Sequence, residues 1–170
     1  IYNFNYNYAI LNHGATIIDK NNKVLFNICI SNEIVSKIRN DLNLSECINY
    51  FCCSEIDSRV TFEHKDLTKI NVRYSSKKYA LDKATFINNK YGNYVKAYYV
   101  DTNSVEIISN KTNKAEAIYW LIKFCNNINK DNTYAIGDSY SDIEMVQEFN
   151  GYCMEDSVSE LKSIAIKEYN

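Results

Sequence analysis

The stretch "NKAEAIYWLIKFCNNINKDNTYAIGDSYSDIEMV" (Asn113–Val146) decides the fold class of this 170-residue chain. Its first part predicts a helix, because apolar side chains recur there at helical spacing. They are Ile118, Leu121, Ile122, Cys125 and Ile128. Asn113 can cap the start of this helix, with Glu116 at the third helical position, the arrangement of a capping box.

A strand, a helix, a strand and a final helix are expected to follow. The run "TYAI" predicts a short buried strand, and a helix is expected from Ser141 to about Phe149. The run "GYCM" predicts a second strand, and Ser157 with Glu160 could cap a last helix. Strands that alternate with helices are typical of a doubly wound parallel sheet.

The first part of the chain has a different pattern. A strand should end near Asn12, and a hairpin should turn at residues 19–22, "DKNN". A helix is expected from Ser31 to about Leu44. The strand-like runs "KINVRY", "VKAYYV" and "SVEIIS", with the helical stretch "SKKYALDKATFINNKYG" among them, then predict an α+β lobe. We therefore expect residues 1–30 and 109–170 to form one α/β body and residues 31–108 to form a separate lobe.

Composition and charge limit the classes of function. Hydrophobic residues make up 46% and charged residues 24% of the chain, as in ordinary globular proteins. The net charge of −2 gives no electrostatic reason to expect nucleic acid or an anionic membrane as a partner. No apolar run reaches the roughly 18 residues that a membrane span needs. The six cysteines include no CxxC pair, and we expect free thiols in a reducing cytoplasm.

Two aspartates follow the predicted strand "TYAI" and mark a candidate site. In open α/β sheets, ligands bind beyond the carboxyl ends of the strands, which is where Asp138 falls. Asp142 falls in the first turn of the next helix, and Gly137 would let a ligand come close. Clustered carboxylates of this kind suit Mg²⁺, which takes one or two carboxylates together with water and phosphate oxygens.

Two other interpretations of the aspartates stay open at this point. Asp138 and Asp142 could simply cap the helix, a role that aspartate often has. The alternating polar residues of "DSYSDIE" could also belong to a calcium loop, but Ile143 stands where an EF-hand loop needs glycine.

Lys114 adds a candidate phosphate ligand. It lies in the first turn of its predicted helix, where a cation opposes the helix dipole. A lysine there can point into water at small cost. A lysine next to a helix N-terminus can also bind phosphate, and the expected strand order brings this helix start to the same sheet edge as Asp138.

These motifs together resemble the haloacid dehalogenase superfamily, and specifically the Cof-type sugar-phosphate phosphatases. "NKTNKAEAIYWLI" contains Lys114, which matches the third motif of that family. Gly137-Asp138 through Asp142 match the fourth motif, and "NHGATIID" is similar to the segment that leads into the family's cap. The resemblance implies a partial, three-layer Rossmann-like core with a parallel sheet and an inserted α+β cap at about residues 31–108.

The resemblance also implies a chemistry. The family hydrolyses phosphate esters of small metabolites such as sugar phosphates, through an aspartyl-phosphate and with Mg²⁺ as cofactor. Asp138 would bind the metal, Lys114 would hold the phosphate and the nucleophile, and Asp142 would orient the metal site. Ser141 stands where the family usually has an asparagine that contacts the phosphate, and its hydroxyl can still donate one hydrogen bond.

One part of the family pattern is missing from these 170 residues. The first motif, DxDGT, carries the nucleophile and the general acid, and the sequence does not contain it. Asp101 also follows an apolar run, but a hairpin turn is the expected role there. We expect the nucleophile to lie outside this sequence, in a longer hydrolase. The alternative is a catalytically inactive module that binds phosphate or a metabolite.

Overall fold

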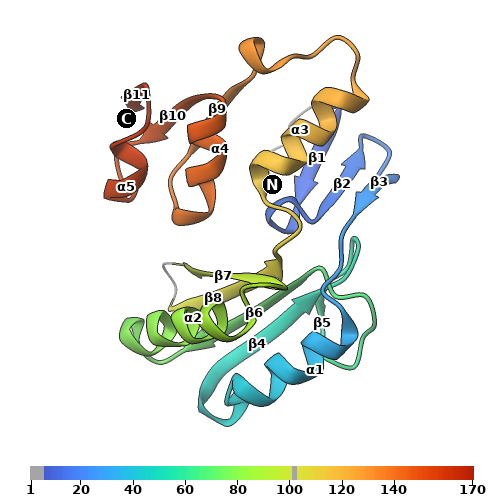
Figure 1. Ribbon diagram of the computed structural model, residues 1–170, viewed down its shortest axis with the longest axis vertical. Coiled ribbons are helices and arrows are strands. Elements are labelled where there is room, and N and C mark those ends of the chain that lie inside the picture. Colours follow the sequence, from blue (N-terminus) through green and yellow to red (C-terminus); the bar gives the residue numbers. More distant parts are fainter. Residues whose placement is uncertain (1–5, 101–102) are drawn as a thin grey trace. The chain divides into compact units, whose positions relative to one another are not determined.

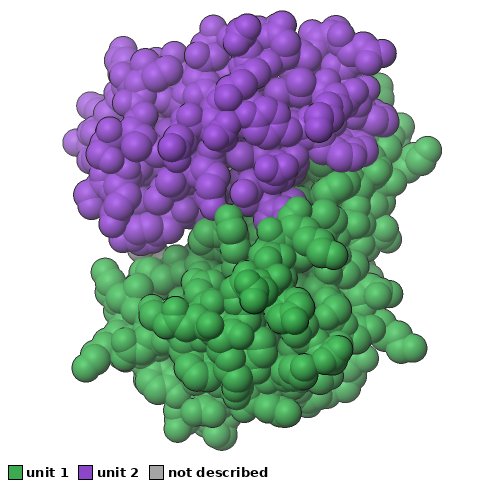
Figure 2. Space-filling model, viewed as in Figure 1, with its two compact units in different colours: residues 1–111 green, residues 112–170 purple. Residues whose placement is uncertain are grey.

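The computed structural model describes residues 6–100 and 103–170, and the chain forms two compact units. Unit 1 comprises residues 1–111 and unit 2 comprises residues 112–170 (Figure 2). The finer division into residues 1–30, 31–108 and 109–170 stays a prediction. In the described part of the chain, the helices are too short or too polar to cross a membrane.

A small antiparallel sheet begins unit 1 (Figure 1). Its strands are β1 (Tyr8–Leu11), β2 (Thr16–Asp19) and β3 (Val24–Asn27), paired in that order. The predicted hairpin turn at residues 19–22 is confirmed. The carboxylate of Asp19 accepts hydrogen bonds from the backbone of Asn21 and Lys23, at 2.8 and 2.9 Å.

The loop η1 (Asn12–Gly14) fastens this small sheet to the rest of unit 1. Its three residues are all left-handed, with φ of 51°, 56° and 99° in chain order. The Asn12 side chain donates to the carbonyl of Ser54 and the hydroxyl of Thr68, at 3.3 and 3.0 Å. Tertiary hydrogen bonds thus accompany a backbone conformation that non-glycine residues seldom adopt.

The larger sheet of unit 1 has five antiparallel strands in the order β5-β4-β6-β8-β7. They are β4 (Cys47–Cys53), β5 (Ser58–Val60), β6 (Lys69–Tyr74), β7 (Val95–Val100) and β8 (Ser104–Ser109). The predicted strands "KINVRY", "VKAYYV" and "SVEIIS" are β6, β7 and β8. Asp101, for which we predicted a turn, lies outside the described residues.

Two helices and a short 3-10 turn accompany this sheet: α1 (Asn32–Asp41), η2 (Leu44–Glu46) and α2 (Lys77–Tyr91). Ser31 caps α1 by accepting from the backbone N–H of Ile34. A single apolar cluster joins both helices to the sheet through buried side chains such as Ile38, Ile70 and Ile87. Helix α1 ends earlier than predicted, because Asn43 adopts a left-handed conformation (φ 50°) that cannot continue a helix.

The other face of the five-stranded sheet carries a polar network. Glu106 on β8 stands opposite Asn71 on β6. One carboxylate oxygen of Glu106 accepts from Lys69 and from Asn71, both at 2.9 Å, and the other oxygen contacts Nε2 of His13. Burial raises the pKa of Glu106, but the hydrogen bond and charge of His13, together with Lys69, outweigh burial and lower it to about 2.

Unit 2 contains a parallel sheet in the order β11-β10-β9. Its strands are β9 (Tyr134–Gly137), β10 (Asn150–Met154) and β11 (Lys167–Tyr169). Its helical elements are α3 (Lys114–Phe124), η3 (Lys130–Asn132), η4 (Tyr140–Asp142), α4 (Ile143–Glu148) and α5 (Ser159–Lys162). The fold is therefore mixed α/β, with an antiparallel sheet in unit 1 and a small parallel sheet in unit 2.

The helices of unit 2 pack on one face of this parallel sheet. Ala135 of β9 packs with Ala115 and Phe149, and Cys153 of β10 packs with Val146 and Leu161. The opposite face is exposed, with 69% of Tyr134 and 55% of Ile136 accessible to solvent. The prediction of a buried "TYAI" strand is therefore wrong, because only alternate residues of β9 face the helices.

Two helix ends in unit 2 also differ from the predictions. Helix α3 ends at Phe124, before Asn126 and Asn127, which are poor helix formers, so Ile128 lies beyond it. The last helix is capped at Val158, not by Ser157. The Ser157 hydroxyl instead accepts from the backbone of Met154 and donates to the carbonyl of Gly137, at 2.9 and 3.2 Å. The chain then continues into the unpredicted strand β11.

Candidate functional site

A pocket of about 280 Å³ lies at the carboxyl end of β9 in unit 2. Its polar lining consists of Lys114, Asp138 and Asp142, and Gly137 belongs to its wall. All of these residues belong to unit 2. The sequence proposed four functional side chains, those of Lys114, Asp138, Asp142 and Ser141. The structure brings the first three together at the sheet edge where parallel strands usually present ligands.

Lys114 and Asp142 form an ion pair in this pocket. Lys114 is the first residue of α3, which Asn113 caps by accepting from the backbone N–H of Glu116 at 2.9 Å. The ammonium nitrogen of Lys114 lies 2.5 Å from Oδ1 of Asp142. The Lys114 side chain is 29% exposed and that of Asp142 only 5% exposed, so the pair is largely shielded from water.

The second oxygen of Asp142 holds the turn after β9 together. Oδ2 accepts from the backbone N–H groups of Asp138 and Ser139, at 3.2 and 3.1 Å, and from the Ser139 hydroxyl at 2.8 Å. Burial raises the pKa of Asp142, but Lys114 and Ser139 outweigh burial and lower it below its ordinary value. Asp142 is therefore a fixed anion that positions both Lys114 and the backbone of the turn.

Gly137 is needed where the Asp142 side chain crosses the end of β9. A Cβ atom at residue 137 would come within 2.4 Å of the Asp142 Cβ atom. Nonbonded carbon atoms pack at about 3.5–4.0 Å, so any other residue would push this carboxylate away. The glycine before the acidic cluster thus makes room for Asp142.

Asp138 has a different environment from Asp142. Its side chain is exposed at the mouth of the turn. Partial burial, followed by the negative charge of Asp142, raises the pKa of Asp138, while Lys114 opposes this effect. A cation next to Asp138 would relieve this repulsion.

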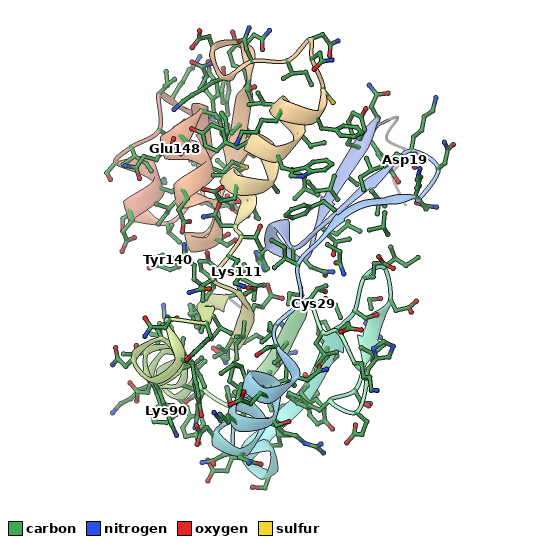
Figure 3. All side chains as sticks on the ribbon, turned by 45° about the vertical axis from the view of Figure 1, so that its right-hand side comes forward. Asp19, Cys29, Lys90, Lys111, Tyr140 and Glu148 are labelled. Atoms are coloured by element: carbon green, nitrogen blue, oxygen red, sulfur yellow. The ribbon has the colours of Figure 1, made fainter. Side chains whose placement is uncertain are left out.

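Ser141 does not line the pocket. It is 4% exposed, and its hydroxyl lies 3.0 Å from the hydroxyl of Ser139. Ser139 is the residue that sequence reasoning missed, although its spacing to Asp142 is that of a capping box, which could have identified it. Tyr140 and Glu148, labelled in Figure 3, mark the start of η4 and the end of α4 in this segment.

The residues of the pocket fit a Mg²⁺ ion that the protein binds together with water and a phosphate group. Mg²⁺ requires only one or two carboxylates from the protein, with water and phosphate oxygens as its other ligands. Asp138 supplies an exposed carboxylate, while the carboxylate of Asp142 is already occupied by Lys114 and the turn. Within residues 6–100 and 103–170, three or more acidic, histidine or cysteine side chains do not gather as a self-contained metal site. This arrangement does not favour a calcium loop, which needs many protein oxygens.

The fold is similar to several solved structures. A HAD/COF-like hydrolase from Plasmodium vivax matches with a TM-score of 0.80 and 14% identity, over 92% of this chain. A haloacid dehalogenase-like hydrolase from B. subtilis matches with a TM-score of 0.77 and 16% identity, over 95%. A sugar phosphatase of HAD subclass IIB matches with a TM-score of 0.80 and 14% identity, also over 95%.

These similarities are in the fold, and they cover only part of each solved structure. The chain spans 64% of the P. vivax chain, 73% of the B. subtilis chain and 69% of the sugar phosphatase chain. It therefore has the fold of a haloacid dehalogenase-like protein with part of the core. No curated protein matches the sequence significantly.

The sequence itself establishes the family. Residues 53–169, well over half of the chain, match the profile of haloacid dehalogenase-like hydrolases. The chain belongs to this hydrolase family, as its motifs predicted.

Proposed function

We propose that this chain is part of a Mg²⁺-dependent phosphatase that hydrolyses small phosphorylated metabolites such as sugar phosphates. One observation carries the proposal. An ammonium group, Lys114, and an exposed carboxylate, Asp138, share a single pocket at the end of a parallel strand. The charges suit a phosphate monoester that is bound jointly by a cation and a lysine.

Each residue has a distinct proposed role. Lys114 binds a phosphate oxygen and contacts the nucleophile, and Asp142 holds the lysine in place through the 2.5 Å ion pair. Asp138 would hold Mg²⁺, which supplies positive charge beside the phosphoryl oxygens when it is bound. The hydroxyl of Ser141, which is directed to Ser139, contributes to phosphate binding only if its side chain turns toward the pocket.

The nucleophile lies outside these 170 residues in this proposal, because the sequence has no DxDGT motif. The 170-residue chain alone should therefore bind Mg²⁺ and phosphate without turning over a substrate. A longer protein that includes a DxDGT strand should hydrolyse p-nitrophenyl phosphate in the presence of Mg²⁺. If the longer protein binds both ligands but stays inactive, the chain is a phosphate-binding module and not part of a phosphatase.

Binding to the 170-residue chain tests the site without any activity. Calorimetric titration with Mg²⁺ and inorganic phosphate together should show that each ligand strengthens the binding of the other. Asp138→Asn should weaken Mg²⁺ binding, and Lys114→Ala should weaken phosphate binding. Asp131→Asn, on the exposed turn η3, serves as a control and should change neither affinity.

A further inference from the structure

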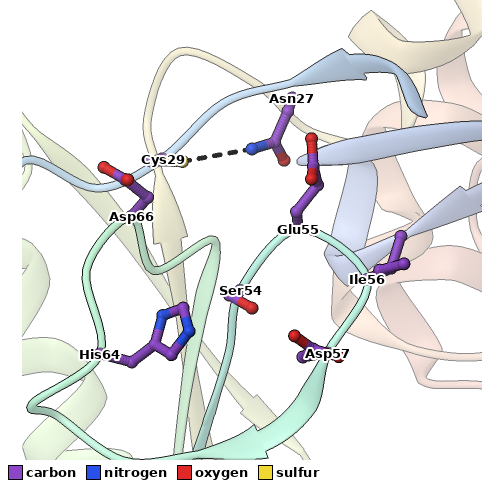
Figure 4. Close-up of a pocket in the computed structure, with 8 residues that line it drawn as sticks. All are labelled: Asn27, Cys29, Ser54, Glu55, Ile56, Asp57, His64 and Asp66. Atoms are coloured by element: carbon purple, nitrogen blue, oxygen red, sulfur yellow. Dashed lines mark hydrogen bonds between the residues drawn. The ribbon is translucent and has the colours of Figure 1, made fainter.

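A second pocket, of about 330 Å³, lies within unit 1 and has no part in the site described above. Figure 4 shows the residues that line it, which all belong to residues 27–66. Its volume falls in the range of small-molecule sites. None of the residues assigned to the phosphatase site takes part, so this pocket is independent of the proposed function.

The pocket has an unmatched negative charge. Three carboxylates line it, those of Glu55, Asp57 and Asp66, and within the described residues none of the three has a cationic partner. No lysine or arginine is part of the lining. Burial, followed by the charge of Asp66, raises the pKa of the Cys29 thiol, which therefore stays neutral and adds no charge to the pocket.

Within the described residues, Ser54 presents an unpaired hydroxyl to the pocket. The residue is only 4% exposed, yet it lines the pocket. Its backbone is fully used: the N–H donates to the carbonyl of Asp57 at 3.0 Å, and the carbonyl accepts from Thr68 at 2.9 Å. Its hydroxyl, by contrast, has no hydrogen-bond partner among the described residues. In Figure 4 this hydroxyl and the carboxylate of Asp57 point toward one another.

This hydroxyl is accessible from the pocket, where water or a ligand can bond to it, and a charged donor would make a stronger hydrogen bond than a neutral one. His64 offers a further acceptor. Its Nδ1 lies 2.6 Å from the carbonyl of Lys65 and donates to it, so in the neutral imidazole Nε2 can accept a hydrogen bond. The pocket therefore presents several acceptors and three carboxylates, and its neutral donors, such as the Asn27 amide, carry no positive charge to balance them.

We propose that this pocket binds the ammonium group of a small alkylamine. An ammonium group has three N–H donors and one positive charge. It can donate to Ser54, to Asp57 and to either Glu55 or His64. A metal ion fits less well, because in the described parts of the chain no three of these side chains approach closely enough to hold one. The three carboxylates would repel an anion, and a neutral ligand would leave them unpaired.

The test is a titration of the ¹⁵N-labelled 170-residue chain with putrescine, followed by amide chemical shifts. Saturable shifts should be confined to residues 27–29, 54–57 and 64–66. The diol 1,4-butanediol has nearly the same shape without charge, and it should not shift these amides. Mg²⁺ at the same concentration should not displace the amine.

Variants distinguish specific binding of putrescine in this pocket from its non-specific attraction to an acidic protein. Asp57→Asn should raise the Kd for putrescine by about tenfold or more, because a hydrogen bond to a charged group is lost. Asp82→Asn, on the exposed surface of α2, removes the same charge and should change Kd by less than about twofold. Ser54→Ala should also raise Kd, while leaving the melting temperature of the free chain unchanged or slightly higher.

Equal effects of Asp57→Asn and Asp82→Asn would overturn the proposal, since they would indicate non-specific charge attraction. Shifts spread over all acidic surfaces, or the absence of saturation, would overturn it as well. If Asp57→Asn does not fold, Ser54→Ala and Glu55→Gln decide the question alone. An unchanged Kd in both would then exclude the site.

Discussion

The ammonium nitrogen of Lys114 lies 2.5 Å from Oδ1 of Asp142, a residue 28 positions later in the chain. The pair joins the start of α3 to the turn after β9. Replacing either partner should therefore destabilise unit 2. Asp142→Asn should lower the free energy of unfolding by about 1–3 kcal/mol, because Asp142 also accepts from two backbone N–H groups.

Urea unfolding of both single variants and the double variant measures this coupling. Lys114→Ala should destabilise the chain too, although a lysine at a helix start opposes the helix dipole. The double variant should lose less stability than the sum of the single losses, by about 1 kcal/mol or more. Additive losses would mean that the two side chains do not interact in solution.

Asp138→Asn should separate stability from metal binding. The side chain of Asp138 is exposed at the pocket, and partial burial, followed by the charge of Asp142, raises its pKa. A neutral asparagine removes this repulsion, so the free energy of unfolding should change by less than about 0.5 kcal/mol. Mg²⁺ affinity, followed by calorimetry, should fall sharply. Unchanged Mg²⁺ affinity would contradict the metal assignment.

Glu106 should make the stability of the chain depend on pH under acidic conditions. Its pKa is lowered from the ordinary value of 4.5 to about 2 in the folded state. The folded state therefore binds the proton less readily than the unfolded state does. The contribution of Glu106 is complete above about pH 4.5, and it is lost as the pH falls toward 2. It amounts to roughly 3 kcal/mol.

Urea unfolding between pH 2 and 6, in the original chain and in Glu106→Gln, checks this dependence. The variant should be less stable near pH 6 and equal to the original chain near pH 2. Glu116→Gln, on the exposed side of α3, should leave the pH dependence unchanged. Parallel curves for the original chain and Glu106→Gln would show that Lys69 and His13 do not stabilise the carboxylate.

Gly137→Ala should disturb the turn through the Asp142 side chain. The added methyl group would approach the Asp142 Cβ atom to 2.4 Å, so the carboxylate must move. We expect a loss of about 1–3 kcal/mol in unfolding free energy, together with weaker phosphate binding. Ile136→Ala, at the exposed neighbouring position, should cost less than about 1 kcal/mol. Equal costs for both variants would argue against the close packing of residue 137.

The sequence predicted the strands β6, β7 and β8 and the cores of α1, α2 and α3, because each has a strong apolar period. It could not predict the exposure of β9. A four-residue run such as "TYAI" has the same letters whether one or both faces of the sheet are covered, and only the tertiary structure decides this. A last helix was predicted from Ser157 and Glu160, but α5 is too short for a periodic signal that would fix its bounds, and the three-residue strand β11 gives no such signal at all.

The candidate site was predicted in part for a similar reason. Lys114, Asp138 and Asp142 meet in one pocket because the ends of adjacent elements converge at a sheet edge, which follows from the order of helices and strands. The direction of each side chain does not follow from that order. The order of elements therefore does not predict that Asp142 binds Lys114, or that Ser141 turns away toward Ser139, although the Ser139–Asp142 spacing is compatible with a capping box in the turn.

The exposed face of the parallel sheet in unit 2 affects how the 170-residue chain can be handled in solution. Parallel sheets are normally covered on both faces, whereas here Tyr134, Ile136 and Tyr169 are 69%, 55% and 43% exposed. Such a surface should bind hydrophobic dyes and should scatter more light as the protein concentration rises. Ammonium sulfate should precipitate the chain early, because sulfate strengthens the burial of apolar surface. Dilute, low-salt buffers are therefore the conditions in which its binding constants should be measured.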